Sequence, residues 1–168
     1  VTAPGPDADD VALGDYFSTL SGLEDSPVAV APAELVQQTA IEDDGWRTEL
    51  GWAPVDLTGD VSAGQPPDHL QAFFADFDAG AVDDAVHTDP TWSDQLEEVE
   101  YDGLTYYSWG DDGSIDPAGL STVRRLGESA RLFVDEDAGL AYWTRNTALM
   151  EQALDTFTGD APSLADDP

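Results

Sequence analysis

The sequence predicts an α+β fold, in which hairpins form an antiparallel sheet and the helices pack on one face of it. Two segments, 96–109 and 130–143, have the pattern of hairpins of short strands. Apolar residues three or four positions apart mark helices that are segregated from these strands, which is typical of the class. We expect a single α+β domain at 10–160, after a disordered acidic, Pro- and Gly-rich lead at 1–9 and before a tail or cut point at 161–168.

The N-terminal third of the chain contains the weaker signals of secondary structure. A helix is expected over residues 10–22, and a second is expected to begin at Pro32, which suits the first turn of a helix. Glycines and prolines within residues 42–67 favour loops around short strands or one helical turn. Trp46 and Trp52 are expected to anchor this stretch to the core.

The signals become stronger from residue 69 onwards. Residues 69–77 predict a strand, and Asp78 then caps a helix that stops before Pro90. A last helix is expected to begin after Asn146, which caps it, and to end at Gly159.

The stretch at 96–109 predicts a hairpin with a two-residue turn. Asp102-Gly103 is a preferred turn pair, because glycine adopts a positive φ without steric clash. This turn places Val99 opposite Tyr106. The other face of the hairpin then contains Glu98, Glu100, Thr105, Tyr107 and Trp109.

The charge of the chain limits its partners. The formal net charge is −31, from 36 acidic residues and five arginines, and there is no lysine. Phosphate binding needs basic side chains, so nucleic acid is excluded as a partner. A cationic ligand or a basic protein would be attracted, although an acidic surface also serves solubility and suits a saline habitat.

The absence of cysteine excludes disulfides, thiolate catalysis and zinc–thiolate sites. No run of about 18 apolar residues is present, so we expect no transmembrane segment. The chain begins with Val1 in a stretch rich in Pro, Gly and Asp. We expect a mature form whose full-length precursor carries a leader and a lipid anchor.

Three segments share a resemblance: "PPDHLQAFFADFDAGAVDDAV", "YDGLTYYSWG" and "GDAPSLADDP". They resemble uncharacterised exported proteins of high-GC Gram-positive bacteria, often predicted lipoproteins, that carry a domain of unknown function. The resemblance covers residues 45–168. It implies an extracytoplasmic location, at the cell surface or secreted, and it implies no activity and no catalytic residues.

The loop "GDDGSID" is a candidate metal site. Asp111, Asp112, Ser114 and Asp116 surround Gly113, and Ca²⁺ takes about 6–8 oxygen ligands of this kind. The EF-hand pattern is not met, because glycine occupies a ligand position and no glutamate stands at the twelfth position. Solvated turn residues are the alternative interpretation. We expect no other cofactor.

His69 and His87 are the two histidines of the chain. A metal site that joins both with Asp76 or Asp89 has no diagnostic spacing. His87 also has a structural interpretation, because a cation is favoured at the C-terminus of a helix.

Carboxylates and aromatic rings share one face of the first hairpin. Glu98, Glu100, Tyr107 and Trp109 form a candidate ligand-binding surface, since aromatic rings with carboxylates suit sugars or cations. The alternative is that Trp109 packs under a helix while the acids point outward at the edge of the sheet.

No nucleophile elbow, phosphate loop or diagnostic metal motif is present in the sequence. We therefore predict an exported, highly acidic, non-enzymatic binding or interaction domain whose ligand is unknown. The alternative function is an extracytoplasmic hydrolase that uses paired carboxylates or a bound metal.

We predict that the melting temperature rises with NaCl, because counterions screen the repulsion among surface carboxylates over about 8–10 Å. Thermal unfolding followed by circular dichroism, in NaCl and in CaCl₂ at matched ionic strength, measures this. An equal rise in both salts indicates screening alone, and a larger rise in CaCl₂ supports a calcium-binding loop. Unchanged melting in both salts contradicts the prediction.

Overall fold

One six-stranded antiparallel sheet organises the described residues, 43–65 and 68–162, of a computed structural model. The strands follow the order β1-β2-β6-β5-β4-β3, and every neighbouring pair is antiparallel. The α+β class and the antiparallel sheet predicted from the sequence are confirmed. The strands are β1 (Gly59–Gln65), β2 (Asp68–Phe74), β3 (Leu96–Tyr101), β4 (Leu104–Trp109), β5 (Ala130–Asp135) and β6 (Leu140–Thr144).

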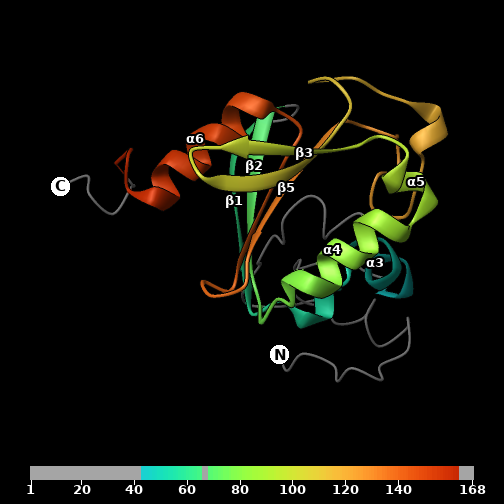
Figure 1. The fold of residues 1–168 in the computed structure, drawn as a ribbon, viewed down its shortest axis with the longest axis horizontal. Helices are drawn as coiled ribbons and strands as arrows, with labels where there is room; N and C mark the ends of the chain where they lie inside the picture. The colour runs from blue at the N-terminus through green and yellow to red at the C-terminus, as the bar shows by residue number, and fades with distance from the viewer. Residues whose placement is uncertain (1–42, 66–67, 163–168) are drawn as a thin grey trace, which may run out of the picture.

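The last hairpin of the chain lies at the centre of the sheet (Figure 1). β6 pairs with β2 on one side and with β5 on the other, so Tyr142 lies opposite both Ala72 and Phe133. The first four residues of β5 are all buried. A central strand that is covered on both faces has such a continuous pattern instead of an alternating one.

The turn between β3 and β4 has the geometry that its sequence predicts. Asp102 and Gly103 have φ angles of 50° and 83°, and a type I′ turn requires a positive φ at both positions. Tyr101 lies opposite Leu104 and Val99 lies opposite Tyr106. The predicted register of the first hairpin is therefore confirmed.

The predicted caps of the two longer helices are also confirmed. The Asp78 side chain accepts a hydrogen bond from the backbone of Ala81 at 3.0 Å, and that of Asn146 accepts one from Leu149 at 3.1 Å. Gly159 ends the last helix with a φ of 88°. The helices of the described residues are α3 (Asp43–Leu50), α4 (Ala79–Thr88), α5 (Pro90–Ser93) and α6 (Thr147–Thr158), with 3-10 turns η1 (Pro54–Asp56) and η2 (Pro117–Gly119).

The helices lie on both faces of the sheet, which corrects the expectation that they share one face (Figure 1). Met150 and Leu154 of α6 pack in one cluster with Phe133. Leu132, the preceding residue of the same strand, packs in the other cluster with residues of α3, α4 and α5. Successive strand residues point to opposite faces, so the two clusters are on opposite sides of the sheet.

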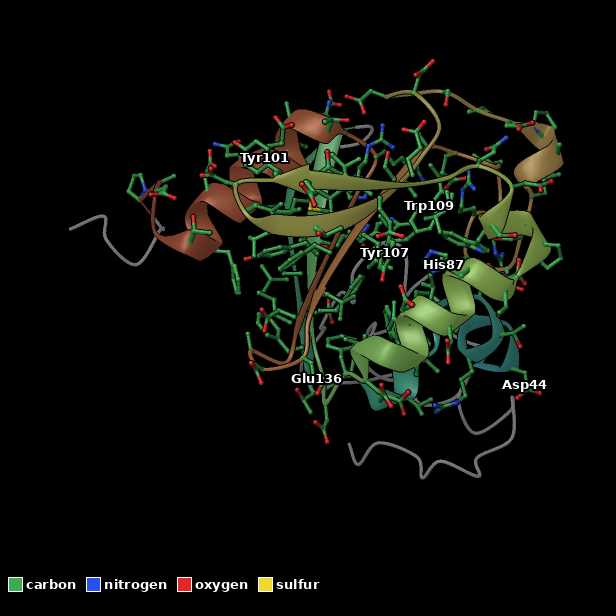
Figure 2. All side chains as sticks on the ribbon, viewed as in Figure 1. Asp44, His87, Tyr101, Tyr107, Trp109 and Glu136 are labelled. Atoms are coloured by element: carbon green, nitrogen blue, oxygen red, sulfur yellow. The ribbon has the colours of Figure 1, made fainter. Side chains whose placement is uncertain are left out.

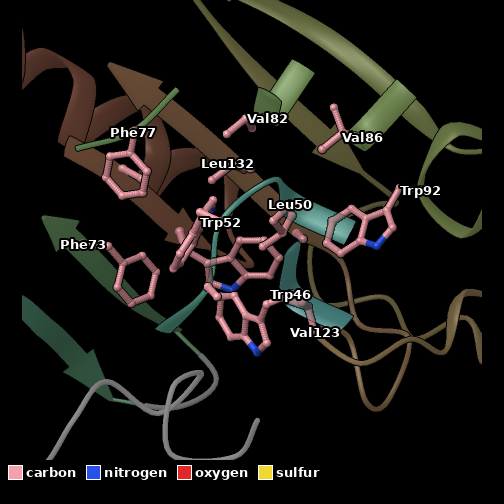
Figure 3. Packing of buried hydrophobic residues seen from close by; sticks show 14 of the residues in the cluster. Trp46, Leu50, Trp52, Phe73, Phe77, Val82, Val86, Trp92, Val123 and Leu132 are labelled. Atoms are coloured by element: carbon pink, nitrogen blue, oxygen red, sulfur yellow. The ribbon is translucent and has the colours of Figure 1, made fainter. Parts of the chain in front are cut away.

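All five tryptophans are buried in the cluster on the α3–α5 side. The rings of Trp46 and Trp52 meet edge to face with centroids 4.8 Å apart (Figure 3). Those of Trp92 and Trp109 do the same at 4.5 Å. Such pairs add about 0.5–1.5 kcal/mol beyond the area they bury. The predicted anchoring of Trp46 and Trp52 in the core is confirmed.

Residues 43–65 contain more regular structure than their sequence indicates. They include the eight-residue helix α3 and the seven-residue strand β1. A Cβ atom at Gly45 of α3 would lie 2.5 Å from Oγ1 of Thr122. This glycine lowers helix propensity, but it also permits the close approach of a distant segment. Gly45 therefore does not mark a loop. It is a helical residue whose lack of a side chain lets Thr122 pack against α3.

Several expected elements lie outside the described residues: the lead at 1–9, the helices at 10–22 and from Pro32, and residues 163–168 of the tail. Within residues 43–65 and 68–162, no helix combines the length and the apolar character needed to cross a membrane.

A buried carboxylate joins α3 to two distant segments. Glu49 is 6% exposed. Its Oε2 accepts from Nε1 of Trp92 at 3.0 Å and from the backbone of Val123 at 3.2 Å. Its Oε1 accepts from the backbone of Thr122 at 2.7 Å. Three N–H groups thus replace water around the charge, which makes its burial tolerable and fixes α5 and the loop at 120–127 against α3.

We predict that Glu49→Gln lowers the free energy of unfolding by about 1–3 kcal/mol. The amide NH₂ group would face a backbone donor and leave a buried N–H without an acceptor. Urea denaturation measures the change. The exposed Asp94→Asn is the control, with an expected change within about 0.5 kcal/mol. A Glu49→Gln variant as stable as the unmodified chain would contradict this role.

Candidate functional site

The structure brings three of the four predicted ligand-binding residues to an accessible face of the first hairpin. Glu98 and Tyr107 lie opposite one another across β3 and β4, and Glu100 lies two residues along on the same face. Trp109 has 0% exposure, and its Nε1 donates to the backbone oxygen of Trp92 at 2.9 Å. Trp109 therefore fits the core-packing alternative, because it has no exposed surface that a ligand could contact.

Helix α4 adds two side chains beside this face (Figure 2). Nε2 of His87 lies 3.2 Å from Oε1 of Glu98, and its Nδ1 lies 2.8 Å from the backbone oxygen of Asp83. The hydroxyl of Tyr107 donates to Oδ1 of Asp83 at 2.9 Å. The rings of His87 and Tyr107 meet edge to face at 6.2 Å. We call Asp83, His87, Glu98 and Tyr107 the α4–hairpin cluster.

The surroundings raise the pKa of both rings in this cluster. For His87 the main cause is the hydrogen bond to the backbone oxygen of Asp83, and the carboxylates of Asp83 and Glu98 add to it against the effect of desolvation. Burial, followed by the hydrogen bond to Asp83, raises the pKa of Tyr107 well above its usual value. Tyr107 therefore stays a neutral donor, while His87 gains a proton more readily than a free histidine.

The chemistry of the α4–hairpin cluster favours positive charge. The side chains of Asp83 and Glu98 are 53% and 56% exposed. Glu100 is exposed next to them. Accessible carboxylates beside an aromatic ring attract ammonium and guanidinium groups. The cluster contains no serine, threonine or cysteine nucleophile.

The predicted metal loop directs its carboxylates to different partners. Oδ1 of Asp112 accepts from Nη2 of Arg131 and from Oγ1 of Thr147, both at 2.7 Å. Asp116 caps the η2 turn by accepting a backbone N–H at 2.9 Å, and this bond is the main cause that lowers its pKa. The structure does not gather the four side chains around one centre, and calcium binding stays a prediction for Asp111, Asp112, Ser114 and Asp116.

The two histidines belong to different elements. His69 is 6% exposed in β2, and its Nε2 lies 2.7 Å from the side-chain amide of Gln71. Asp89, one of the acids suggested beside the histidines, caps α5 through the backbone of Thr91 at 2.8 Å. In the part of the chain that the structure describes, no group of three or more His, Cys, Asp or Glu side chains is placed to hold a metal ion.

A pocket of about 240 Å³ opens beside the metal loop. We call it the α6 pocket, because Asn146, the cap of α6, is in its wall. An ion pair of 2.6 Å joins Glu128 to Arg145 in the same wall, and their side chains are 8% and 26% exposed. The lining residues are Asp68 and residues 112–115, 128–129 and 145–146.

Sequence reasoning missed Asp83, Glu128 and Arg145 as residues of these two sites. A signal was present for Asp83, because it precedes His87 by four positions on a predicted helix, and residues with this spacing are neighbours. No comparable signal exists for Glu128 and Arg145, because only the pairing of β5 with β6 brings their segments together.

No protein-family model, curated protein or solved structure matches this chain. The basis for a functional conclusion is therefore the geometry and charge of the described residues.

The raised pKa of His87 predicts stabilisation that depends on pH. Asp83 and Glu98 stabilise the protonated ring, so this contribution is fully present below the unfolded pKa of 6.5. It is lost as the pH rises through the higher folded pKa. NMR titration of the His87 ring protons measures the folded value, which we expect above 6.5.

The Glu98→Gln variant should lower the pKa of His87, whereas Glu97→Gln should leave it nearly unchanged. Glu97 lies on the same strand with the same charge, but it points to the opposite face of the hairpin. A His87 pKa at or below 6.5 in the unmodified chain would show that the two carboxylates do not favour the protonated ring.

Proposed function

We propose that this chain is an exported, acidic, non-enzymatic binding domain, and that a cationic segment of a partner binds at the α4–hairpin cluster. One observation carries the proposal: carboxylates from two elements, Asp83 of α4 and Glu98 of β3, converge on one accessible surface around Tyr107. Glu100 extends this acidic surface along β3.

The net charge of −31 supports a cationic partner. The summed field of many carboxylates raises the local concentration of cations and the rate at which they arrive. A single exposed ion pair contributes only about 0–1 kcal/mol. A partner with several basic groups is therefore favoured over a single monovalent cation, because it would meet Asp83, Glu98 and Glu100 together.

The partners of the carboxylates support binding over hydrolysis. A hydrolase with paired carboxylates keeps one of them protonated as a general acid. Here Glu98 lies beside His87, Asp112 beside Arg131 and Glu128 beside Arg145. Each of these acids is paired with a basic side chain. Hydrolysis stays an alternative prediction, and no contact in the described residues favours it.

Export is the second part of the proposal. This part rests on the sequence expectation alone, because no family model, curated protein or solved structure matches the chain. An extracytoplasmic domain that displays an acidic surface would meet basic segments of cell-surface or secreted partners, which is the setting that the proposed binding requires.

We predict that a peptide of alternating lysine and glycine binds more tightly than its glutamine analogue, and that added NaCl weakens the binding by screening. Isothermal titration calorimetry measures both affinities. The triple variant Asp83→Asn, Glu98→Gln, Glu100→Gln should bind the lysine peptide at least about tenfold more weakly, a loss of about 1.4 kcal/mol.

The matched control removes three acids elsewhere, with Asp94→Asn, Glu97→Gln and Asp137→Asn. Both triple variants change the net charge equally, so an equal loss in both would show that net charge alone attracts the peptide. That result, or equal binding of the lysine and glutamine peptides by the unmodified chain, would overturn the proposed site. Thermal melting checks that both variants are folded.

A further inference from the structure

The α6 pocket differs from the acidic surface of the α4–hairpin cluster, because an arginine lines it together with acidic residues. It is built from segments that are distant in sequence and fixed by hydrogen bonds. Ser129, which is 0% exposed, accepts from the backbone of Gly113 at 3.2 Å and donates to the backbone oxygen of Arg145 at 3.2 Å. The wall of the pocket is therefore held in place without a ligand.

The charges of the α6 pocket are only partly matched within the chain. Arg131 pairs with Asp112, and Arg145 pairs with Glu128. The third acid, Asp68, has a long contact of 3.4 Å from Nδ2 of Asn146. Asp68 is thus the acid of this pocket that forms no ion pair with another described residue.

Arg145 has hydrogen-bonding capacity beyond its ion pair. A guanidinium group has five N–H donors, and within residues 43–65 and 68–162 the side chain of Arg145 makes one hydrogen bond, from Nη2 to Glu128. The Arg145 side chain is 26% exposed where it lines the pocket. The planar guanidinium group can donate two parallel hydrogen bonds to a carboxylate or a phosphate.

These charges select the class of ligand. A simple anion would suit Arg145, but the net charge of −31 repels it. A simple cation would suit Asp68, but Arg145 is in the same wall. A zwitterion is neutral overall, so the field does not repel it, and it can place one charge on each residue.

The volume of the pocket and the apolar side chain of Ile115 further limit which ligands fit it. The volume of about 240 Å³ is below the range of about 300–1,000 Å³ for pockets that take drug-sized ligands. Ile115 lines the pocket with 62% of its surface exposed, so it has apolar surface to offer a short aliphatic chain.

We propose that the α6 pocket binds a free aliphatic α-amino acid, with the ligand's carboxylate on Arg145 and its ammonium group on Asp68. This site shares no residue with the α4–hairpin cluster. It does not depend on the binding of a cationic partner there, and the probes that test it differ from the lysine peptide.

The experiment compares three probes that share one carbon chain: leucine, 3-methylbutylamine without the carboxylate, and 4-methylpentanoate without the ammonium group. Calorimetry and the backbone amide shifts of Ser129 and Asn146 follow binding to the chain at physiological ionic strength. We expect saturable binding of leucine and at least about tenfold weaker binding of each analogue, since each lacks one charge-assisted contact.

Two variants test the assigned residues. Asp68→Asn should weaken leucine binding at least about tenfold. The double variant Glu128→Gln, Arg145→Gln removes both charges of this ion pair together, so that neither is left without the other, and it should weaken leucine binding to a similar extent. Asp137→Asn, at the exposed turn between β5 and β6, should bind leucine as the unmodified chain does.

Four results would overturn the proposal: leucine binding weaker than a Kd of about 1 mM, an amine or a carboxylate analogue that equals leucine, leucine affinity unchanged in both site variants, or amide shifts that leave Ser129 and Asn146 unaffected.

Discussion

The burial of the tryptophan cluster is the interaction on which the rest of this structure depends. A chain with a net charge of −31 repels itself when compact, and burial of apolar surface is the main term that opposes the repulsion. A fully buried tryptophan removes about 150–250 Å² from water, which corresponds to an upper bound of about 4–6 kcal/mol. The five rings belong to the cluster between the sheet and the helices α3, α4 and α5, and Tyr107 of the α4–hairpin cluster packs against it.

Two of the five arginines of the chain are buried. Arg124 is 1% exposed, lies 5.3 Å above the ring of Trp92 and donates from Nε to the backbone oxygen of Glu128. Arg131 is 3% exposed and donates to the backbone oxygen of Trp109. Burial lowers the pKa of Arg124, but a guanidinium group stays charged near neutral pH. The outer surface is left with mostly negative charge, which favours the cationic partner proposed here.

The fold could be predicted where local chemistry decides it, as at the Asp102-Gly103 turn and the caps Asp78, Asn146 and Gly159. It could not be predicted where distant contacts decide it. Gly45 suggests a loop until Thr122 is placed against it, and the buried run of β5 does not reveal that helices cover both faces.

For the candidate site, alternation in the hairpin placed Glu98 and Tyr107 together. The same alternation could not separate Trp109, which is in the core, from its exposed neighbours, because a period of two gives the face and not the depth of burial.

The central position of β6 has a consequence for the synthesis of the chain. β2 and β5 are joined only through β6, which is made after the hairpins β1–β2 and β3–β4. The sheet can therefore be completed only after β6 has been made. Long-range pairing of this kind is slow, so the edges of the earlier hairpins stay unpaired until β6 is in place. The acidic side chains of β3 help to keep such edges on different nascent chains from pairing with one another.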